Sequence, residues 1–257
     1  MRVLVTNDDG YDAPGLVAVA ESLLQAGHEV TVGAPLTERS GSGSSLGTIE
    51  DGSLIPMSER RIRTLGDTPV YALDCPPALA VIAMCSGTFG PPPQLVVSGI
   101  NPGHNTGRSV LFSSTVGAVL AARITGISGV AISSGFAPHH RFDTAAAVTR
   151  RFIDWFDAQH AGRPLTLNVN VPDVDSAALQ GIRLTELAAK SMFTMRLARA
   201  EDHLVLRREE RSSGFPPGTD GAAVADGYVS VTPLTSVGAD LSQLHSDQLP
   251  DLSAALN

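Results

Sequence analysis

Short, continuous apolar runs alternate with segments of helical periodicity along most of this chain, and this alternation restricts the fold more than any other feature. The first run covers residues 2–6 and the second covers residues 29–34. Between them Pro14 suits an early helical position, apolar residues recur at helical spacing, and Gly27 ends the pattern. A strand, a helix and a second strand within so short a span predict a βαβ unit with a parallel, right-handed connection.

The same alternation repeats further along the chain. Further strands are expected at 70–73, 94–98, 130–133 and 165–171, and further helices at 76–84, 115–124 and 142–160. The strand-like runs are continuously apolar, which is typical of a parallel sheet covered on both faces. We therefore predict an α/β fold with three α/β/α layers, a doubly wound and mostly parallel sheet, and a Rossmann-like core over residues 1–181.

The pattern changes at residue 182. Shorter strand-like pieces at 204–208 and 228–233 are separated by a stretch from 214 to 221 that contains several glycines. With 257 residues and 43% hydrophobic content, the chain can bury one substantial core. Residues 182–257 are therefore expected to form an irregular, β-rich extension of the same domain.

Charge and residue usage exclude several classes of function. The formal charge of -8 disfavours binding to a nucleic acid polymer, although a mononucleotide is compatible with it. Lys190 is the only lysine, so a phosphate-binding lysine loop of the Walker type cannot form. Cys75 and Cys85 are expected to be free thiols, not zinc ligands. The sequence contains no stretch long and apolar enough to span a membrane, so we expect a cytoplasmic protein without a membrane partner.

Polar loops follow three of the expected parallel strands, at residues 7–10, 39–45 and 98–107. Because the carboxyl ends of parallel strands meet at one edge of a doubly wound sheet, these loops should lie together. The first loop contains two adjacent carboxylates, Asp8 and Asp9, which repel each other unless a cation joins them. A polar turn that caps the following helix is the alternative explanation for these two residues.

The side chains of these loops offer carboxylate, hydroxyl and amide oxygens. Oxygen donors select hard cations, and few carboxylates with room for water suit Mg²⁺ or Mn²⁺ better than Zn²⁺. Backbone N–H groups around Gly41, Gly43, Gly103 and Gly107 can hold an anion, and Thr115 begins a helix whose N-terminus favours phosphate. One divalent cation per subunit beside such an anion site predicts phosphoryl transfer.

Several sequence blocks are similar to the successive signatures of one family. They read VTNDDGYDAPG, RSGSGSSLG, VSGINPGHNTG, STVGAVLAA, LNVNVPD and GTDGAAVADGYVSVTPL, in this order from Met1 to about Leu234. This series resembles the SurE family, the survival protein E nucleotidases. The resemblance implies a metal-dependent phosphatase that acts on nucleoside monophosphates, a small phosphorylated substrate, with some members accepting other phosphomonoesters or polyphosphate.

The resemblance also implies roles for individual residues. The expected metal ligands are Asp8, Asp9, Ser40 and Asn101. The residues expected to take part in catalysis are Asn7, Asp8, Asp9 and Asn105. Those expected to bind substrate are Gly41, Ser44, Gly103, His104, Gly107, Ser113, Ser114 and Thr115. The segment at 216–220 is expected to reach across a subunit contact, which predicts a homodimer or homotetramer assembled through the C-terminal extension.

Some positions depart from the family pattern. Ser114 stands where that pattern has Gly, Ala121 where it has an acidic residue, and residues 74–78 read DCPPA. These changes leave the expected metal ligands intact and affect the substrate pocket. A relative specialised for another phosphorylated metabolite is therefore an alternative.

Two mechanisms fit these residues. A water molecule activated by the cation can attack phosphorus in line, or Asp8 or Asp9 can attack it and form an aspartyl phosphate. Water attack is favoured because a carboxylate engaged by a metal is a poor nucleophile. His104 is a candidate proton donor to the leaving group. A non-catalytic metabolite-binding protein and a phosphate-accepting signalling module are the other two classes, and the second lacks its usual late-strand lysine.

Overall fold

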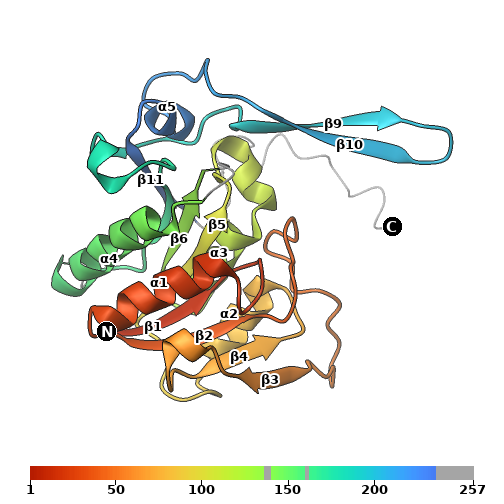
Figure 1. Ribbon diagram of the computed structural model, residues 1–257. Helices are drawn as coiled ribbons and strands as arrows, with labels where there is room; N and C mark the ends of the chain where they lie inside the picture. The colour runs from red at the N-terminus through yellow and green to blue at the C-terminus, as the bar shows by residue number, and fades with distance from the viewer. Residues whose placement is uncertain (136–139, 160–161, 236–257) are drawn as a thin grey trace, which may run out of the picture.

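The computed structural model describes residues 1–135, 140–159 and 162–235, and within these ranges nine strands form one mixed sheet (Figure 1). Their order across the sheet is β3-β4-β2-β1-β5-β6-β7-β11-β8. In chain order the strands are β1 Arg2–Thr6, β2 Glu29–Pro35, β3 Met57–Arg60, β4 Val70–Leu73, β5 Leu95–Pro102, β6 Ser128–Ser134, β7 Thr166–Asn170, β8 Ile182–Leu184 and β11 Val229–Leu234.

Strand pairing confirms the doubly wound, mostly parallel sheet. The six strands from β4 to β7 in that order pair in parallel, whereas β3 and β11 run antiparallel to β4 and β7. From β1 the chain builds outward through β2 and β4, and then returns to build the other side from β5. The order therefore reverses between β1 and β5, which is where open α/β sheets bind their ligands.

Two helices cover each face of the sheet (Figure 1). On one face lie α1, Pro14–Gln25, and α4, Phe142–Gln159; on the other lie α2, Pro77–Cys85, and α3, Ser114–Ile124. Successive residues of β1 point to opposite faces, so Val3 and Val5 pack in the cluster with α1 and α4 whereas Leu4 packs with α2 and α3. Both faces of β1 are buried because helices cover the sheet on each side. The last residue of the expected fourth helix, at 160, lies outside the described residues.

The segment after residue 181 divides between the main sheet and a separate hairpin. Strand β11 pairs with β7, and β8 pairs with β11, so both extend the main sheet. Strands β9, Phe193–Arg199, and β10, Leu204–Glu210, form a two-stranded antiparallel hairpin that projects from the body (Figure 1). A short helix, α5, Asp220–Ala225, lies before β11, in a stretch where the sequence indicated a loop up to residue 221.

Some elements were not expected from the sequence. Strands β3 and β8 have four and three residues and are largely exposed, so they carry no buried apolar run by which to recognise them. Within the described ranges, we find no helix with the length and apolar character needed to cross a membrane.

Candidate active site

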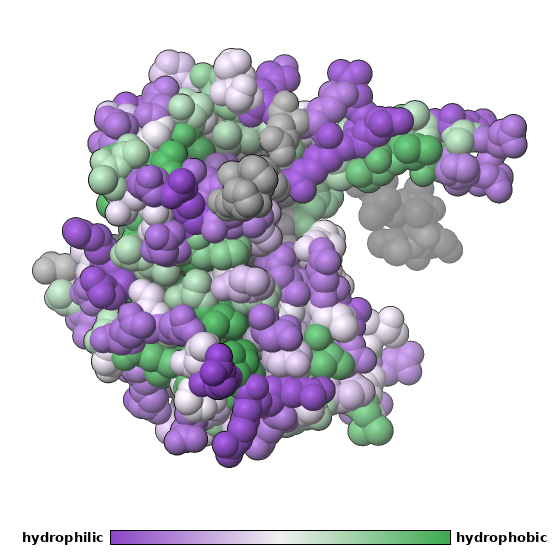
Figure 2. All heavy atoms as spheres, in the orientation of Figure 1, coloured by the Kyte–Doolittle hydropathy of each residue, from purple (hydrophilic) through white to green (hydrophobic). Residues whose placement is uncertain are grey.

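The expected site loops meet at the carboxyl edge of the sheet, beside the reversal between β1 and β5. Together they form a cleft of about 530 Å³, and the residues that line it include Asp8, Asp9, Ser40, Asn101 and Asn105. The molecule is visibly hollowed beneath the projecting hairpin (Figure 2). The structure thus brings together residues from three loops that are far apart in the sequence.

Asp8 is held in place from two sides. The Thr115 hydroxyl donates a hydrogen bond of 2.7 Å to Asp8 Oδ1, and the Arg39 backbone N–H donates one of 2.7 Å to the Asp8 carbonyl. Asp8 is 3% exposed. Burial raises the pKa of its carboxyl, while hydrogen bonds from Thr115 and Ser40 act in the opposite direction.

Asp9 is the more exposed member of the pair. Burial, together with the negative charges of Asp8 and Glu38, raises the pKa of Asp9 to about 7. Two carboxylates in this position therefore repel each other at neutral pH. A bound cation would remove that repulsion, so the electrostatics of the pair fit a metal site.

The donor set also fits a hard cation. Within residues 1–135, 140–159 and 162–235, His, Cys, Asp and Glu side chains do not gather in any group of three that could hold a metal. The candidate ligands are instead two carboxylates supplemented by the Ser40 hydroxyl and the Asn101 amide, all of which line the cleft. Mg²⁺ and Mn²⁺ bind carboxylate oxygens together with neutral oxygen donors such as a hydroxyl and an amide carbonyl.

The end of β5 and the loop that follows it are shaped by their own hydrogen bonds. The strand was expected to end at residue 98, but it continues to Pro102 after a shift in its register with β6, so Asn101 lies in its last part. Asn101 Nδ2 donates to the Gly103 carbonyl at 2.6 Å, and the Gly103 N–H donates to the Ser134 carbonyl at 2.9 Å. Because Nδ2 of Asn101 is bound within the loop, its Oδ1 is the side-chain atom that could ligate a cation. The contact to Ser134 also ties this loop to the end of β6.

Asn105 is fixed by a buried polar network based on β7. Its backbone N–H donates to Asn170 Oδ1 at 2.8 Å, and its carbonyl accepts hydrogen bonds from the amides of Asn168 and Asn170. Its own side-chain amide donates to Ser133 Oγ at 2.9 Å. The LNVN segment was recognised in the sequence as a signature block, but its role as the support of Asn105 was missed.

Asp220 is a second residue that sequence reasoning missed. It is fully buried at the start of α5, where Oδ2 accepts from the Gly107 N–H at 2.7 Å. Its Oδ1 accepts from the N–H groups of Ala188 and Gly221. Burial raises the pKa of this carboxyl, and these backbone donors oppose the shift. Asp220 therefore anchors the C-terminal segment to the loop that carries Asn101 and Asn105.

Ser114 connects the second site loop to helix α3. Its hydroxyl donates to the Arg39 carbonyl at 3.0 Å and accepts from the Gly43 N–H at 3.1 Å. The Ser42 hydroxyl lies 2.9 Å from the same oxygen. A Cβ atom added at Gly117 would lie 2.3 Å from the Gly43 carbonyl oxygen, so the loop and the helix are in close contact.

The expected substrate-binding residues divide into two groups. Those that line the cleft are Gly41, Gly103, His104 and Ser113. Those outside its lining are Ser44, Gly107, Ser114 and Thr115. In the second group Ser44 is exposed on the surface, whereas the other three support the loops as described above. Ser113 also caps α3, because its hydroxyl accepts from the Val116 N–H.

Asn7 and His104 are both buried. Asn7 Oδ1 accepts a hydrogen bond of 3.3 Å from the Gly10 N–H, its Nδ2 has no hydrogen-bond partner among the described residues, and the residue lies outside the cleft lining. His104 Nε2 donates to the Val171 carbonyl at 2.9 Å. Burial lowers the pKa of His104, so its ring is a poor proton donor at neutral pH.

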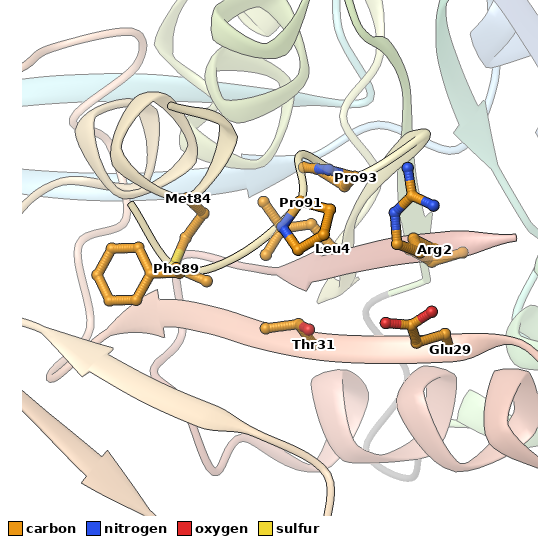
Figure 3. Close-up of a pocket in the computed structure, with 9 residues that line it drawn as sticks. Arg2, Leu4, Glu29, Thr31, Met84, Phe89, Pro91 and Pro93 are labelled. Carbon is orange, nitrogen blue, oxygen red and sulfur yellow. The ribbon is translucent and has the colours of Figure 1, made fainter. Parts of the chain in front are cut away.

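A separate hollow lies at the opposite edge of the sheet, where β1 and β2 begin (Figure 3). It has a volume of about 70 Å³, and its lining includes Leu4, Met84 and Phe89 together with Arg2 and Glu29. It is small and lacks a cluster of carboxylates. The cleft at the carboxyl edge is the candidate active site because both adjacent carboxylates line it.

The two cysteines are free and buried, and burial raises the pKa of each thiol to about 11.

The fold and this site define a doubly wound α/β protein with a cleft at the sheet's carboxyl edge that contains two adjacent carboxylates. The family model described as "Survival protein SurE" matches residues 3–194, and the chain belongs to the SurE family. A protein from Ruthia magnifica named "5'-nucleotidase SurE" is 36% identical over 91% of this chain and 92% of its own length. One from Yersinia pestis, named "5'/3'-nucleotidase SurE", is 35% identical over 91% of this chain and 89% of its own.

A solved structure shares the fold. The crystal structure of a SurE protein from Aquifex aeolicus superposes with a TM-score of 0.76 at 33% sequence identity. The similarity covers 91% of this chain and 93% of that one. The comparison therefore includes the C-terminal segment as well as the core.

Proposed function

We propose that this protein hydrolyses phosphomonoesters, with nucleoside 5'-monophosphates as substrates and one divalent cation, Mg²⁺ or Mn²⁺, in each subunit. The observation that carries the proposal is the position of Asp8 and Asp9, adjacent carboxylates with raised pKa values in a cleft at the switch point of the sheet. The names of the nucleotidase relatives support the same reaction.

The cation would be held by Asp8, Asp9, Ser40 and Asn101. When bound, it would supply Lewis-acid polarisation of the phosphoryl group and a lowered pKa for the attacking water. The Thr115 hydroxyl fixes the rotamer of Asp8 through Oδ1, and the Arg39 N–H fixes the backbone of the same residue. These contacts orient the carboxylate before substrate arrives, which reduces the reorganisation needed during the reaction.

The phosphate end of the cleft is assembled from backbone and neutral polar groups. Gly41 and Gly103 line it and allow the backbone to approach a bound anion closely. Helix α3 begins beside it at Ser114, and a helix N-terminus favours negative charge. Asn105, held rigidly by β7, lines the same cleft and can orient a phosphoryl oxygen or the attacking water.

A phosphate-release assay tests this proposal. Purified protein is incubated with adenosine 5'-monophosphate and with Mn²⁺, Mg²⁺ or a chelator, and we expect release only with a cation. Asp8→Asn and Asn101→Ala should each abolish turnover while circular dichroism and the unfolding midpoint remain near those of wild type. Release by the chelator-stripped protein, or near-normal rates in both variants, would contradict the proposal.

The nucleophile can be tested separately. Water attack leaves no covalent phosphate on the protein, whereas attack by Asp8 or Asp9 forms an acyl phosphate. Hydroxylamine added during turnover should therefore trap no derivative of these two residues in a mass spectrum. A trapped hydroxamate would replace water attack with the aspartyl phosphate route.

We also propose that the protein associates with itself through its C-terminal extension. The projecting hairpin exposes apolar side chains partway along its length (Figure 2). Leu197 and Leu204 of this hairpin are each 63% exposed. Light scattering should give the mass of a dimer or tetramer, and Leu197→Glu should lower it. A monomeric mass for wild type at micromolar concentration would overturn this proposal.

A further inference from the structure

The cleft has two chemically different ends. One end contains the carboxylates and the glycine-rich loops described above, and the other is formed by the base of the β9–β10 hairpin. The hairpin residues that line it are Phe193, Met195, Leu206 and Arg208. They belong to the same continuous cleft as Asp8 and Asn105, so a single small molecule can contact both ends.

Strand register places these four side chains on one face of the hairpin. In the antiparallel pair, Met195 lies opposite Arg208 and Leu206 lies opposite Leu197. Residues two apart along a strand share a face, and directly opposed residues share it too. The neighbouring Arg207 therefore lies on the other face, opposite Arg196.

The hairpin base presents an extended, largely apolar surface. Met195 and Leu206 are 54% and 56% exposed, and the Arg208 guanidinium carbon lies 4.6 Å from the centre of the Phe193 ring. A flat aromatic ring of a ligand can stack on a guanidinium that already lies over an aromatic side chain. Phe112, which is 55% exposed, lines the same cleft.

The hairpin base is held in register with the catalytic loop. The Met192 N–H donates to Thr106 Oγ1 at 3.0 Å, and the Ser109 N–H donates to Ser191 Oγ at 3.1 Å. Thr106 directly follows Asn105, so these bonds fix the apolar surface relative to the residue expected to contact phosphate. A rigid separation between the two ends selects substrates by the size and shape of the leaving group.

We infer that the hairpin base, made of Phe193, Met195, Leu206 and Arg208, binds the flat base of a nucleoside monophosphate while the carboxylate end holds its phosphate. The inference rests on the proposed phosphomonoester hydrolysis and names the part of the molecule that selects its substrate. The surface is apolar and carries one guanidinium, which suits an aromatic ring better than a sugar or a short polyol. Leu197 and Leu204 share this face of the hairpin but lie outside the cleft lining, so the four residues named are the ones that adjoin the phosphate end.

Paired substrates and paired variants test the inference. Adenosine 5'-monophosphate and ribose 5-phosphate share the phosphate and the sugar, and only the first has a base. Arg208→Ala and Leu206→Ala should each raise KM for adenosine 5'-monophosphate by about tenfold and leave KM for ribose 5-phosphate unchanged. The first variant loses a stacked guanidinium, and the second loses an apolar contact with the base. Arg207→Ala is the matched control and should change neither value.

Each other outcome has a defined meaning. Equal KM changes for the two substrates, or no change for either, would overturn the base-binding assignment while leaving the hydrolase intact. A lowered oligomer mass with unchanged KM in Leu206→Ala would assign this face to contact between copies of the chain, and would also overturn it. If wild type released phosphate from neither substrate, the proposed function itself would fail.

A binding measurement keeps the inference testable without turnover. Saturation-transfer NMR with adenosine as the probe should show transfer to the base protons in wild type. The transfer should be lost in Arg208→Ala and kept in Arg207→Ala. Equal transfer in all three proteins would overturn the assignment whether or not the protein is an active hydrolase.

Discussion

Thr115 Oγ1 donates a 2.7 Å hydrogen bond to Asp8 Oδ1 in a fully buried contact. The bond joins the first turn of α3 to the end of β1, two segments that are more than a hundred residues apart in the chain. It counters the effect of burial on the Asp8 carboxyl, whose pKa would otherwise be raised further. Thr115 thus acts through Asp8, as a positioning residue.

Replacement of Thr115 should therefore affect chemistry more than folding. Thr115→Val keeps the shape and removes the donor, and the loss of one hydrogen bond to a charged group, about 1.5–3 kcal/mol, corresponds to a drop in kcat of about ten- to a hundredfold. Thr115→Ser keeps the donor hydroxyl and should therefore keep most of the wild-type kcat. Thr125→Val, at the other end of α3, is the control and should keep wild-type kcat. Equal kcat in Thr115→Val and wild type would show that this bond has no part in the reaction.

Asp220 should be important for both stability and activity, although it lies outside the cleft lining. Asp220→Asn replaces one acceptor oxygen with an amide nitrogen, so at least one of the three buried N–H groups loses its partner. We expect the free energy of unfolding to fall by about 1–3 kcal/mol. Denaturant titration measures this, and kcat should fall too because the 101–107 loop loses its anchor.

Asp226 supplies the matched control for that substitution. It ends the same short helix, but its carboxylate is exposed and pairs with Arg183 at the surface. Such pairs contribute little to stability, so Asp226→Asn should change neither the unfolding free energy nor kcat appreciably. Similar losses in both variants would show that α5, and not the buried contacts of Asp220, is the sensitive feature.

Ser114 should stabilise the glycine-rich loop at 39–45. Ser114→Gly removes a hydroxyl that contacts the Arg39 carbonyl, the Gly43 N–H and the Ser42 hydroxyl. We expect faster hydrogen exchange at the Gly43 amide and weaker competitive inhibition by inorganic phosphate. Ser45→Ala, which removes an exposed hydroxyl that contacts the Gly47 N–H, should leave both unchanged. Unaltered exchange at Gly43 in Ser114→Gly would refute this role.

The sequence predicted the core of this fold because each strand there is buried on both faces. Val3, Leu4 and Val5 are all at most 1% exposed, so the run is continuously apolar and easily recognised. The same logic placed the loops after β1, β2 and β5 at one edge. It could not place β11 beside β7, because pairing of strands sixty residues apart depends on contacts that leave no local pattern.

The supporting residues of the site were also hidden from sequence reasoning. A buried Asn170 or Asp220 is recognisable only when its hydrogen-bond partners are known, and those partners are backbone groups of distant loops. The residues that line the cleft from the hairpin were missed for a similar reason. A strand was expected at 204–208, but β9 was not expected, and a strand pattern does not indicate which cleft its face adjoins.

His104 should make the protein less stable as the pH falls below neutrality. Burial lowers the pKa of its imidazole from the ordinary value of 6.5, although the Val171 carbonyl and Asp173 act in the opposite direction. Between its native pKa and 6.5 the unfolded chain binds more protons than the native protein, so the free energy of unfolding rises with pH across that interval. This contribution is complete above 6.5 and is lost as the pH falls toward the native pKa.

His104→Gln separates this effect from other titrations, because Gln can still donate to the Val171 carbonyl but does not ionise. Urea unfolding of metal-free protein between about pH 5 and 8 should give a shallower decline for the variant on the acidic side. The variant should also keep most of its kcat at neutral pH, since a neutral, buried imidazole is not the proton donor. Identical pH slopes for the variant and wild type would show that His104 does not contribute to the pH dependence of stability. Loss of kcat with an intact fold would show that His104 takes part in the reaction as a general acid.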